Sequence, residues 1–132
     1  MDFTFSNSSL IEKYFLAWSN YDLDLLENIF SDGAQYVILP RKKTLVGIDS
    51  IKEYWIRNSK RQSRLKLSWG NIVNNNDSVF TDFIAEFDDI TISEHMIIAG
   101  TICMLLECNK INLLSEYYTK IELKLSDVFY DD

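Results

Sequence analysis

The N-terminal half of the chain repeats its hydrophobic residues with the period of an amphipathic helix. Three- and four-residue steps predict a first helix with aromatic rings on its buried face, at Leu10, Tyr14, Ala17, Trp18 and Tyr21. Asp22 can cap a second helix, which we expect Ser31-Asp-Gly33 to end. A third helix is expected to open at Gly47. Between the second and third helices, residues 34–39 predict a short strand that Pro40 ends.

The C-terminal half alternates hydrophobic and polar residues, as strands do. It predicts strands over residues 65–73, 79–87, 94–107 and 111–125, the third apolar on both faces and therefore central. In the last strand, the residues expected to face the core are Leu113, Tyr117, Thr119, Ile121, Leu123 and Leu125. The chain should therefore form one α+β domain, residues 1–132, in which three helices cover one face of an antiparallel meander.

The composition favours a folded, acidic protein. Of the 132 residues, 47% are hydrophobic, four are glycine and one is proline, which argues against disordered and low-complexity classes. Thirteen Lys and Arg against 20 Asp and Glu give a net charge of −7, and an acidic surface repels nucleic-acid phosphates. The longest apolar run, Met96 to Leu106, is shorter than the roughly 20 residues of a membrane helix, and the N-terminal residues lack the segments of a signal peptide. We therefore expect a cytoplasmic protein with neither nucleic acid nor membrane as partner.

The cysteines and the histidine predict neither a disulfide nor a metal site. Cys103 and Cys108 lie five residues apart in one extended segment, so they should point to opposite faces as two buried free thiols. One histidine, His95, and two separated cysteines do not make a tetrahedral metal site. The sequence has no glycine-rich phosphate loop and no nucleophile elbow, so no cofactor is expected.

Several segments, in their order and spacing, carry a resemblance to a known family. They are Ile11 to Trp18, Asp22 to Leu26, Phe30 to Ala34, Gly47 to Trp55, and Asn109 to Ile111 with Glu116 to Tyr118. From about Ser9 to Glu122 the chain resembles the nuclear transport factor 2-like superfamily, above all its SnoaL-like and ketosteroid-isomerase-like members. The resemblance implies a curved sheet wrapped around the helices into a cone whose open end admits a small, mostly apolar molecule. It also implies a homodimer paired through the outer sheet face.

Aromatic and aliphatic residues of both halves are expected to meet in the hollow of this cone. A curved sheet packed on helices leaves a concave space, and ligand pockets are typically apolar with a few polar groups. The expected lining residues are Tyr14, Trp18, Tyr36, Ile38, Trp55, Trp69, Phe83 and Tyr117. The alternative is that these rings fill the cone as an ordinary core.

The resemblance supplies only part of a catalytic site. Tyr14 falls where ketosteroid isomerases place a tyrosine that donates a hydrogen bond to a developing oxyanion. Their proton-transferring aspartate stands just before the proline that ends the first strand, where this chain has Ile38 and Leu39. Their second acidic donor would map near Gly100-Thr101, again without a carboxyl group. Isomerase chemistry by that route is therefore not expected.

Other acids and bases of the strands have a simpler interpretation. Asp82 and Glu86 share a strand face but lie roughly 13 Å apart, too far to act on one bond. We therefore expect Asp82 and Glu86 to be solvated or interface residues, and the same holds for Glu116 and Tyr118, which fall on the polar side of the last strand. His95 could act as a base, as in dehydratase-like or cyclase-like relatives, but its place at the start of a strand favours a half-exposed surface residue.

The cluster Arg41-Lys-Lys43 lies near the expected mouth of the cone. It could attract an anionic group of a ligand, or it could be a solvated loop.

Two classes of function follow from these observations. The first is a SnoaL-like pocket protein that binds a small, mostly apolar molecule, with or without isomerase-, dehydratase- or cyclase-type activity. The second is a non-catalytic interaction scaffold, an immunity-like or assembly partner whose acidic surface meets a basic protein. A fold alone does not decide between them.

Overall fold

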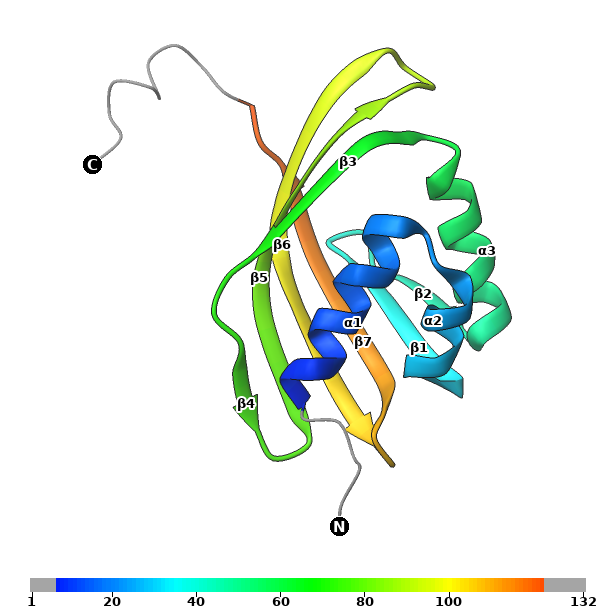
Figure 1. Ribbon diagram of the computed structural model, residues 1–132, viewed down its shortest axis with the longest axis vertical. Helices are drawn as coiled ribbons and strands as arrows, with labels where there is room; N and C mark the ends of the chain where they lie inside the picture. The colour runs from blue at the N-terminus through cyan, green and yellow to red at the C-terminus, as the bar shows by residue number, and fades with distance from the viewer. Residues whose placement is uncertain (1–6, 123–132) are drawn as a thin grey trace, which may run out of the picture.

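The computed structural model describes residues 7–122 of the chain (Figure 1). Its three helices lie at the predicted places: α1 (Asn7–Asn20), α2 (Leu23–Ile29) and α3 (Ile48–Ser59). Asp22 caps α2 as predicted, because its Oδ1 accepts a hydrogen bond from the Leu25 amide at 3.1 Å. Gly47 precedes α3 with a φ of 88°, which glycine adopts at little steric cost.

The strands form one curved, unclosed sheet, and the helices lie on its concave side (Figure 1). The strands are β1 (Phe30–Leu39), β2 (Lys43–Val46), β3 (Gln62–Trp69), β4 (Val73–Asn75), β5 (Ser78–Asp89), β6 (Glu94–Glu107) and β7 (Lys110–Lys120). Their order is β2-β1-β7-β6-β5-β3, and β4 pairs with β5. The antiparallel pairs β3–β5, β5–β6 and β6–β7 confirm the predicted meander. The α+β class with helices on one face is therefore confirmed.

Two edges of the sheet differ from the prediction. β1 pairs with β7 in parallel, so the sheet is mixed, and β2 forms a short antiparallel edge strand beyond a turn where only a loop was expected. The predicted strand over residues 65–73 breaks at Gly70, whose amide bonds the Asp82 carbonyl at 3.1 Å. Residues 1–6 and the end of the predicted last strand, residues 123–125, lie outside the described residues.

The hydrophobic core lies between α1 and the concave face of the sheet. Alternate residues of β5, from Val79 to Phe87, are buried, as the alternation predicted. The buried residues of α1 are Leu10, Ile11, Tyr14, Phe15, Ala17 and Trp18. The Phe15 ring stacks on Trp69 at a centroid distance of 4.7 Å and lies 6.0 Å from Phe83. Side chains therefore fill part of the hollow.

The convex face of the sheet is open to solvent. Its exposed large hydrophobic residues are Phe80, Ile84, Leu105 and Tyr117. Cys103 and Cys108 are free thiols. The expectation that both are buried is wrong, because Cys108 lies in the β6–β7 turn with a φ of 52° and is exposed.

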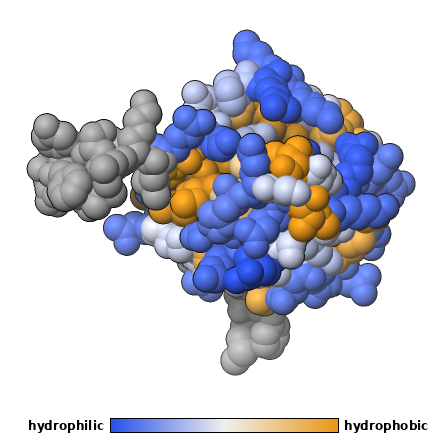
Figure 2. All heavy atoms as spheres, turned by 90° about the horizontal axis from the view of Figure 1, so that it is seen from above, coloured by the Kyte–Doolittle hydropathy of each residue, from blue (hydrophilic) through white to orange (hydrophobic). Residues whose placement is uncertain are grey.

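Hydrophilic side chains dominate the end of the molecule seen from above, with hydrophobic side chains gathered in a few patches between them (Figure 2). The β5–β6 turn lies at this end and exposes Ile90 and Ile92. No helix among residues 7–122 is long and apolar enough to cross a membrane.

Candidate functional site

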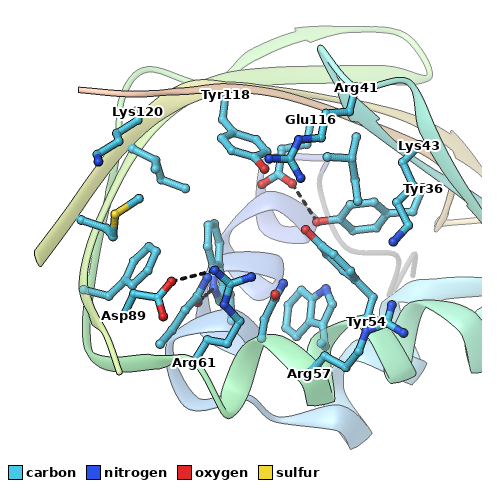
Figure 3. A pocket seen from close by; sticks show the side chains of 18 of the residues that line it. Tyr36, Arg41, Lys43, Tyr54, Arg57, Arg61, Asp89, Glu116, Tyr118 and Lys120 are labelled. Carbon is cyan, nitrogen blue, oxygen red and sulfur yellow. Dashed lines mark hydrogen bonds and ion pairs between the residues drawn. The ribbon is translucent and has the colours of Figure 1, made fainter. Parts of the chain in front are cut away.

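A cavity of about 660 Å³ lies between the helices and the concave face of the sheet (Figure 3). This volume is in the range of small-molecule binding sites. The buried hydrophobic side chains of its wall are Tyr14, Trp18, Tyr36, Ile38, Trp55, Phe87 and Ile98. The rings contributed by α1, β1 and α3 therefore leave a hollow between them and do not close it.

Two phenols and a carboxylate form a hydrogen-bonded chain in the cavity wall. The Tyr14 and Tyr36 hydroxyls lie 2.7 Å apart, and the Tyr36 hydroxyl donates to Glu116 Oε2 at 3.1 Å (Figure 3). When Glu116 is ionised, the one proton of Tyr36 points to the carboxylate, so Tyr14 donates to the Tyr36 oxygen. Helix α1 and strands β1 and β7 each supply one member, and all three side chains are buried.

Burial makes Glu116 an acid that titrates near neutral pH. Its residue is only 5% exposed, and the loss of solvent raises its pKa from 4.5 to about 7, although the hydrogen bond from Tyr36 opposes the shift. Burial and then the charge of Glu116 raise the pKa values of Tyr14 and Tyr36 well above their usual range. At neutral pH the two phenols therefore remain protonated, while Glu116 can both give and accept a proton.

A bulge near the start of β7 turns Glu116 toward the cavity. Leu106 pairs with Ile111, whereas the preceding Leu105 pairs with Leu113, so Asn112 is an extra residue in the ladder. Because side chains alternate along a strand, one extra residue exchanges the two faces from that point on. The prediction that Glu116 is solvated is therefore wrong.

Because of the same exchange of strand faces, the predicted position of Tyr117 is wrong. Tyr117 is 51% exposed on the convex face and does not line the cavity, whereas Tyr118 does. The pattern Glu-Tyr-Tyr has an aromatic residue for either face, so the alternation alone could not show which one faces inward. The sequence has one sign of a bulge, because the hydrophobic residues Ile111 and Leu114 follow a tight turn three residues apart, a spacing that strict alternation does not place on one face. In the structure both are buried.

Gln62, at the start of β3, organises a second polar group in the cavity wall. Its Oε1 accepts a hydrogen bond from Trp18 Nε1 at 3.0 Å and another from the Tyr21 hydroxyl. Burial raises the pKa of Tyr21 above its usual range and that of Tyr54 to about 12. These phenols are therefore hydrogen-bond donors at neutral pH, and sequence reasoning missed all three lining residues, Tyr21, Tyr54 and Gln62.

Exposed basic side chains surround the cavity in Figure 3. The basic residues that line it are Arg41, Lys43, Arg57, Arg61 and Lys120. Asp89, on β5, is the acidic residue among them, and its Oδ2 accepts a hydrogen bond from Arg61 at 2.7 Å. Hydrogen bonds from Thr91 and Arg61 hold the pKa of Asp89 below its usual range.

Of the residues expected to line a pocket, five lie in the cavity wall: Tyr14, Trp18, Tyr36, Ile38 and Trp55. Trp69 does not, because it stacks on Phe15 and is 39% exposed. Phe83 is buried but packs against Trp18, with ring centroids 5.7 Å apart, and not against the cavity. For Trp69 and Phe83 the alternation predicted the correct face of the strand. Side chains of α1 cover this part of the concave face, so neither residue reaches the cavity.

His95 lies outside the cavity. Its side chain is 54% exposed, with Nδ1 2.7 Å from Asp88 and Nε2 2.9 Å from Glu86. These two carboxylates raise its pKa above the usual value. His95 is therefore the half-exposed residue that the sequence favoured, and Asp82 and Glu86 also lie away from the cavity wall.

A carboxylate stands beside the position that the resemblance leaves without one. The resemblance implies that the isomerase aspartate would stand near Ile38 on β1, and the register partner of Ile38 on the parallel strand β7 is Glu116. Ile38 and Glu116 both line the cavity. Gly100 and Thr101 do not line it and carry no carboxyl group. Residues 7–122 contain no group of three or more His, Cys, Asp or Glu residues that could hold a metal ion.

Comparison with known proteins identifies the fold. No family model and no curated protein matches the sequence, but solved structures match the three-dimensional arrangement. A hypothetical protein with a ketosteroid isomerase-like fold from Catenulispora acidiphila, in complex with trimethylamine, gives a TM-score of 0.77 at 13% identity, over 86% of this chain and 88% of that chain. An NTF2-like protein from Burkholderia xenovorans gives 0.71 at 14% identity, over 86% and 88%.

A third match is to an enzyme of stated type. SalBIII, described as an epoxide hydrolase/cyclase-like enzyme in pyran ring formation in the polyether salinomycin, gives a TM-score of 0.74 at 19% identity, over 85% of this chain and 89% of that chain. Identities this low establish shared architecture and not shared activity. The chain therefore has the nuclear transport factor 2-like fold, in the form shared by ketosteroid isomerase-like proteins, as the resemblance implied.

Proposed function

We propose that this protein binds a small molecule with an apolar body in the cavity and acts on it by general acid–base catalysis, with Glu116 as the proton-transferring group. The observation that carries the proposal is the buried Glu116 carboxylate in the cavity wall, hydrogen-bonded to Tyr36 at 3.1 Å. A carboxyl group whose pKa is about 7 is populated in both protonation states at neutral pH. Proton transfer is most effective when the pKa of the catalytic group lies near the working pH.

The aromatic wall supports binding of an apolar body. Tyr14 and Trp55 face each other edge to face at a centroid distance of 5.5 Å, and Trp55 is 3% exposed. Apolar surface that a ligand covers here contributes roughly 25 cal/mol per Å² removed from water. The same wall excludes solvent from Glu116, so a bound molecule would meet the carboxylate in a medium of low polarity.

The proposed step moves one proton out and one proton back. Glu116 accepts a proton from a carbon next to a carbonyl group, and the C–H electron pair moves into an enolate. The Tyr54 and Tyr118 side chains, which line the cavity, supply hydroxyl donors for the developing oxyanion. If the substrate also has a double bond between the β- and γ-carbons, the enolate is conjugated with it. Glu116 then returns the proton to the γ-carbon and the double bond moves next to the carbonyl group, so the isomerisation is balanced without a co-reactant.

Ring formation and epoxide opening would use the same residue. In either case Glu116 takes the proton of the attacking hydroxyl or water while a phenol donates a hydrogen bond to the leaving oxygen. Glu116 then passes its proton to that oxygen. The structural relative SalBIII is described as epoxide hydrolase/cyclase-like, and reactions of that kind move protons in this way.

Exchange of carbon-bound protons tests the proposal without a known substrate. The probe is 2-tetralone in D2O, and loss of its α-proton signals is followed by NMR with wild-type protein, Glu116→Gln and Tyr36→Phe. We expect wild-type protein to accelerate exchange above buffer and the Glu116→Gln variant to lose the acceleration, because an amide cannot accept the proton. A parallel assay follows hydrolysis of styrene oxide.

Controls separate catalysis from binding. Glu107→Gln changes an exposed glutamate at the end of β6 and should leave the exchange rate unchanged. If 2-tetralone binds and shields Trp55 from solvent but neither reaction is accelerated, the catalytic part of the proposal is wrong. The cavity would then have a binding function only. Absence of binding to the cavity by any small molecule would instead favour the scaffold alternative, in which the acidic surface meets a basic protein.

A further inference from the structure

The cavity concentrates positive charge on a protein that is acidic overall. The full chain has a net charge of −7 with 13 basic and 20 acidic residues. Among the described residues, five basic side chains line the cavity, against two acidic ones, Asp89 and Glu116. A cavity lined by one sign of charge attracts molecules of the opposite sign.

Ion pairs within the protein leave part of the positive charge of the cavity free to bind a ligand. Asp89 is bound by Arg61 at 2.7 Å, and Lys120 lies 3.5 Å from Glu94. Arg57 has only a loose contact, 3.8 Å, with Glu53 on the same exposed helix face. Exposed pairs of this kind hold their partners weakly, so a ligand can compete for them.

Arg41 and Lys43 carry the strongest argument. Within residues 7–122, neither has a carboxylate at salt-bridge distance, although both line the cavity. Lys43 Nζ lies 5.9 Å from the ring centroid of Tyr54, and the charge of Arg41 lowers the pKa of the Tyr54 phenol against the effect of burial. Both cations therefore act on the same side of the cavity, beside a phenol of α3 (Figure 3).

We propose that the ligand of this cavity is an organic anion whose acidic group binds Arg41, Lys43 and Arg57 at the mouth while its apolar body reaches the aromatic wall. This inference rests on the proposed function, because it names the substrate class of the same site. The ionised Glu116 in the buried part of the cavity wall repels a second negative charge. The acidic group is thereby held at the mouth, and the uncharged, reacting part is directed to Glu116.

Matched naphthalene probes test the charge directly. The probes are 2-naphthoate, its neutral analogue methyl 2-naphthoate, and 2-naphthyl phosphate, each titrated by calorimetry into the full chain. We expect 2-naphthoate to bind at least about tenfold more tightly than the ester, because charge-assisted hydrogen bonds are the stronger ones. The phosphate arm shows whether the mouth prefers a carboxylate or a phosphate ester.

Variants of the β1–β2 turn locate the effect. The Arg41→Gln/Lys43→Gln double variant should weaken 2-naphthoate binding about tenfold and leave ester binding within about twofold. Lys42→Gln is the matched control, because Lys42 is exposed in the same turn but does not line the cavity. It should bind both probes as wild-type protein does.

Three results would overturn the inference. The first is equal affinity for the acid and the ester. The second is a loss of 2-naphthoate affinity in the Lys42→Gln control as large as in the double variant. The third is that none of the three probes binds. If the ester binds as well as the acid while Glu116→Gln still abolishes proton exchange, the anion inference fails and the proposed function stands. If the acid is preferred but no exchange or hydrolysis is catalysed, the anion inference stands and the catalytic proposal fails.

Discussion

Replacement of Glu116 by glutamine should remove a loss of stability that the wild-type protein shows as the pH rises. In the folded state the pKa of Glu116 is about 7, against 4.5 for an ordinary glutamate. Between these two values the folded protein keeps a proton that the unfolded chain has lost. The free energy of unfolding therefore falls as pH rises through this window, by about 1.4 kcal/mol per pH unit. A group with a raised carboxyl pKa thus contributes its stability at low pH and loses it above pH 4.5.

The size of the effect follows from the two pKa values. Between pH 5 and pH 8, ionisation of Glu116 should lower the free energy of unfolding of the wild-type protein by about 2 to 3 kcal/mol, and Glu116→Gln should not show this loss. The amide of glutamine has its own constant cost, because part of it is left without a partner in a buried site. That cost is the same at both pH values, so the change in the difference between the two proteins isolates the carboxyl group.

Urea unfolding of both proteins at pH 5 and pH 8 measures this quantity. The Glu116→Gln variant should gain about 2 to 3 kcal/mol in free energy of unfolding relative to wild type between the two pH values. The exposed Glu107→Gln serves as the control and should show no such gain. If the difference between Glu116→Gln and wild type is the same at pH 5 and pH 8, Glu116 does not have the environment described here and the catalytic proposal loses its foundation.

Three further predictions address the site, the sheet and the convex face. Tyr36→Phe removes the hydrogen bond that lowers the pKa of Glu116. NMR of the carboxyl carbon should therefore give a pKa for Glu116 above the wild-type value, and an unchanged or lower value would contradict the hydrogen bond. Gly100→Ala should destabilise the protein by about 2 kcal/mol or more in urea unfolding, because a Cβ there would lie 1.9 Å from the Tyr117 carbonyl oxygen; wild-type stability would show that the strands do not approach this closely. Sedimentation should give twice the mass of one chain, with Ile84→Lys on the convex face monomeric; a monomeric wild-type protein at micromolar concentration would remove the expected dimer.

The helices and the central strands could be predicted because local signals agree with the fold there. Asp22 has a capping side chain, and β5 alternates without interruption from Val79 to Phe87. The cap depends only on neighbouring residues, and the alternation depends only on one face being buried. Neither needs knowledge of distant contacts, so a single sequence is sufficient for both.

The candidate site could not be predicted in the same way, because its members meet only through the sheet. Tyr14, Tyr36 and Glu116 are 22 and 80 residues apart along the chain. Parallel pairing of β1 with β7 brings them together, and an α+β meander does not require that pairing. Trp69 and Phe83 were assigned to the correct face, but only the position of α1 decides which part of that face remains open.

The bulge at Asn112 has a consequence for how such proteins evolve. A single inserted codon near the start of β7 is enough to bring Glu116 inward and send Tyr117 outward, with no change in either side chain. Gain or loss of a reactive carboxyl group in this architecture can therefore occur by insertion or deletion alone. A residue-by-residue alignment across such an event would pair groups that occupy opposite sides of the sheet, and would misjudge which descendants kept the chemistry.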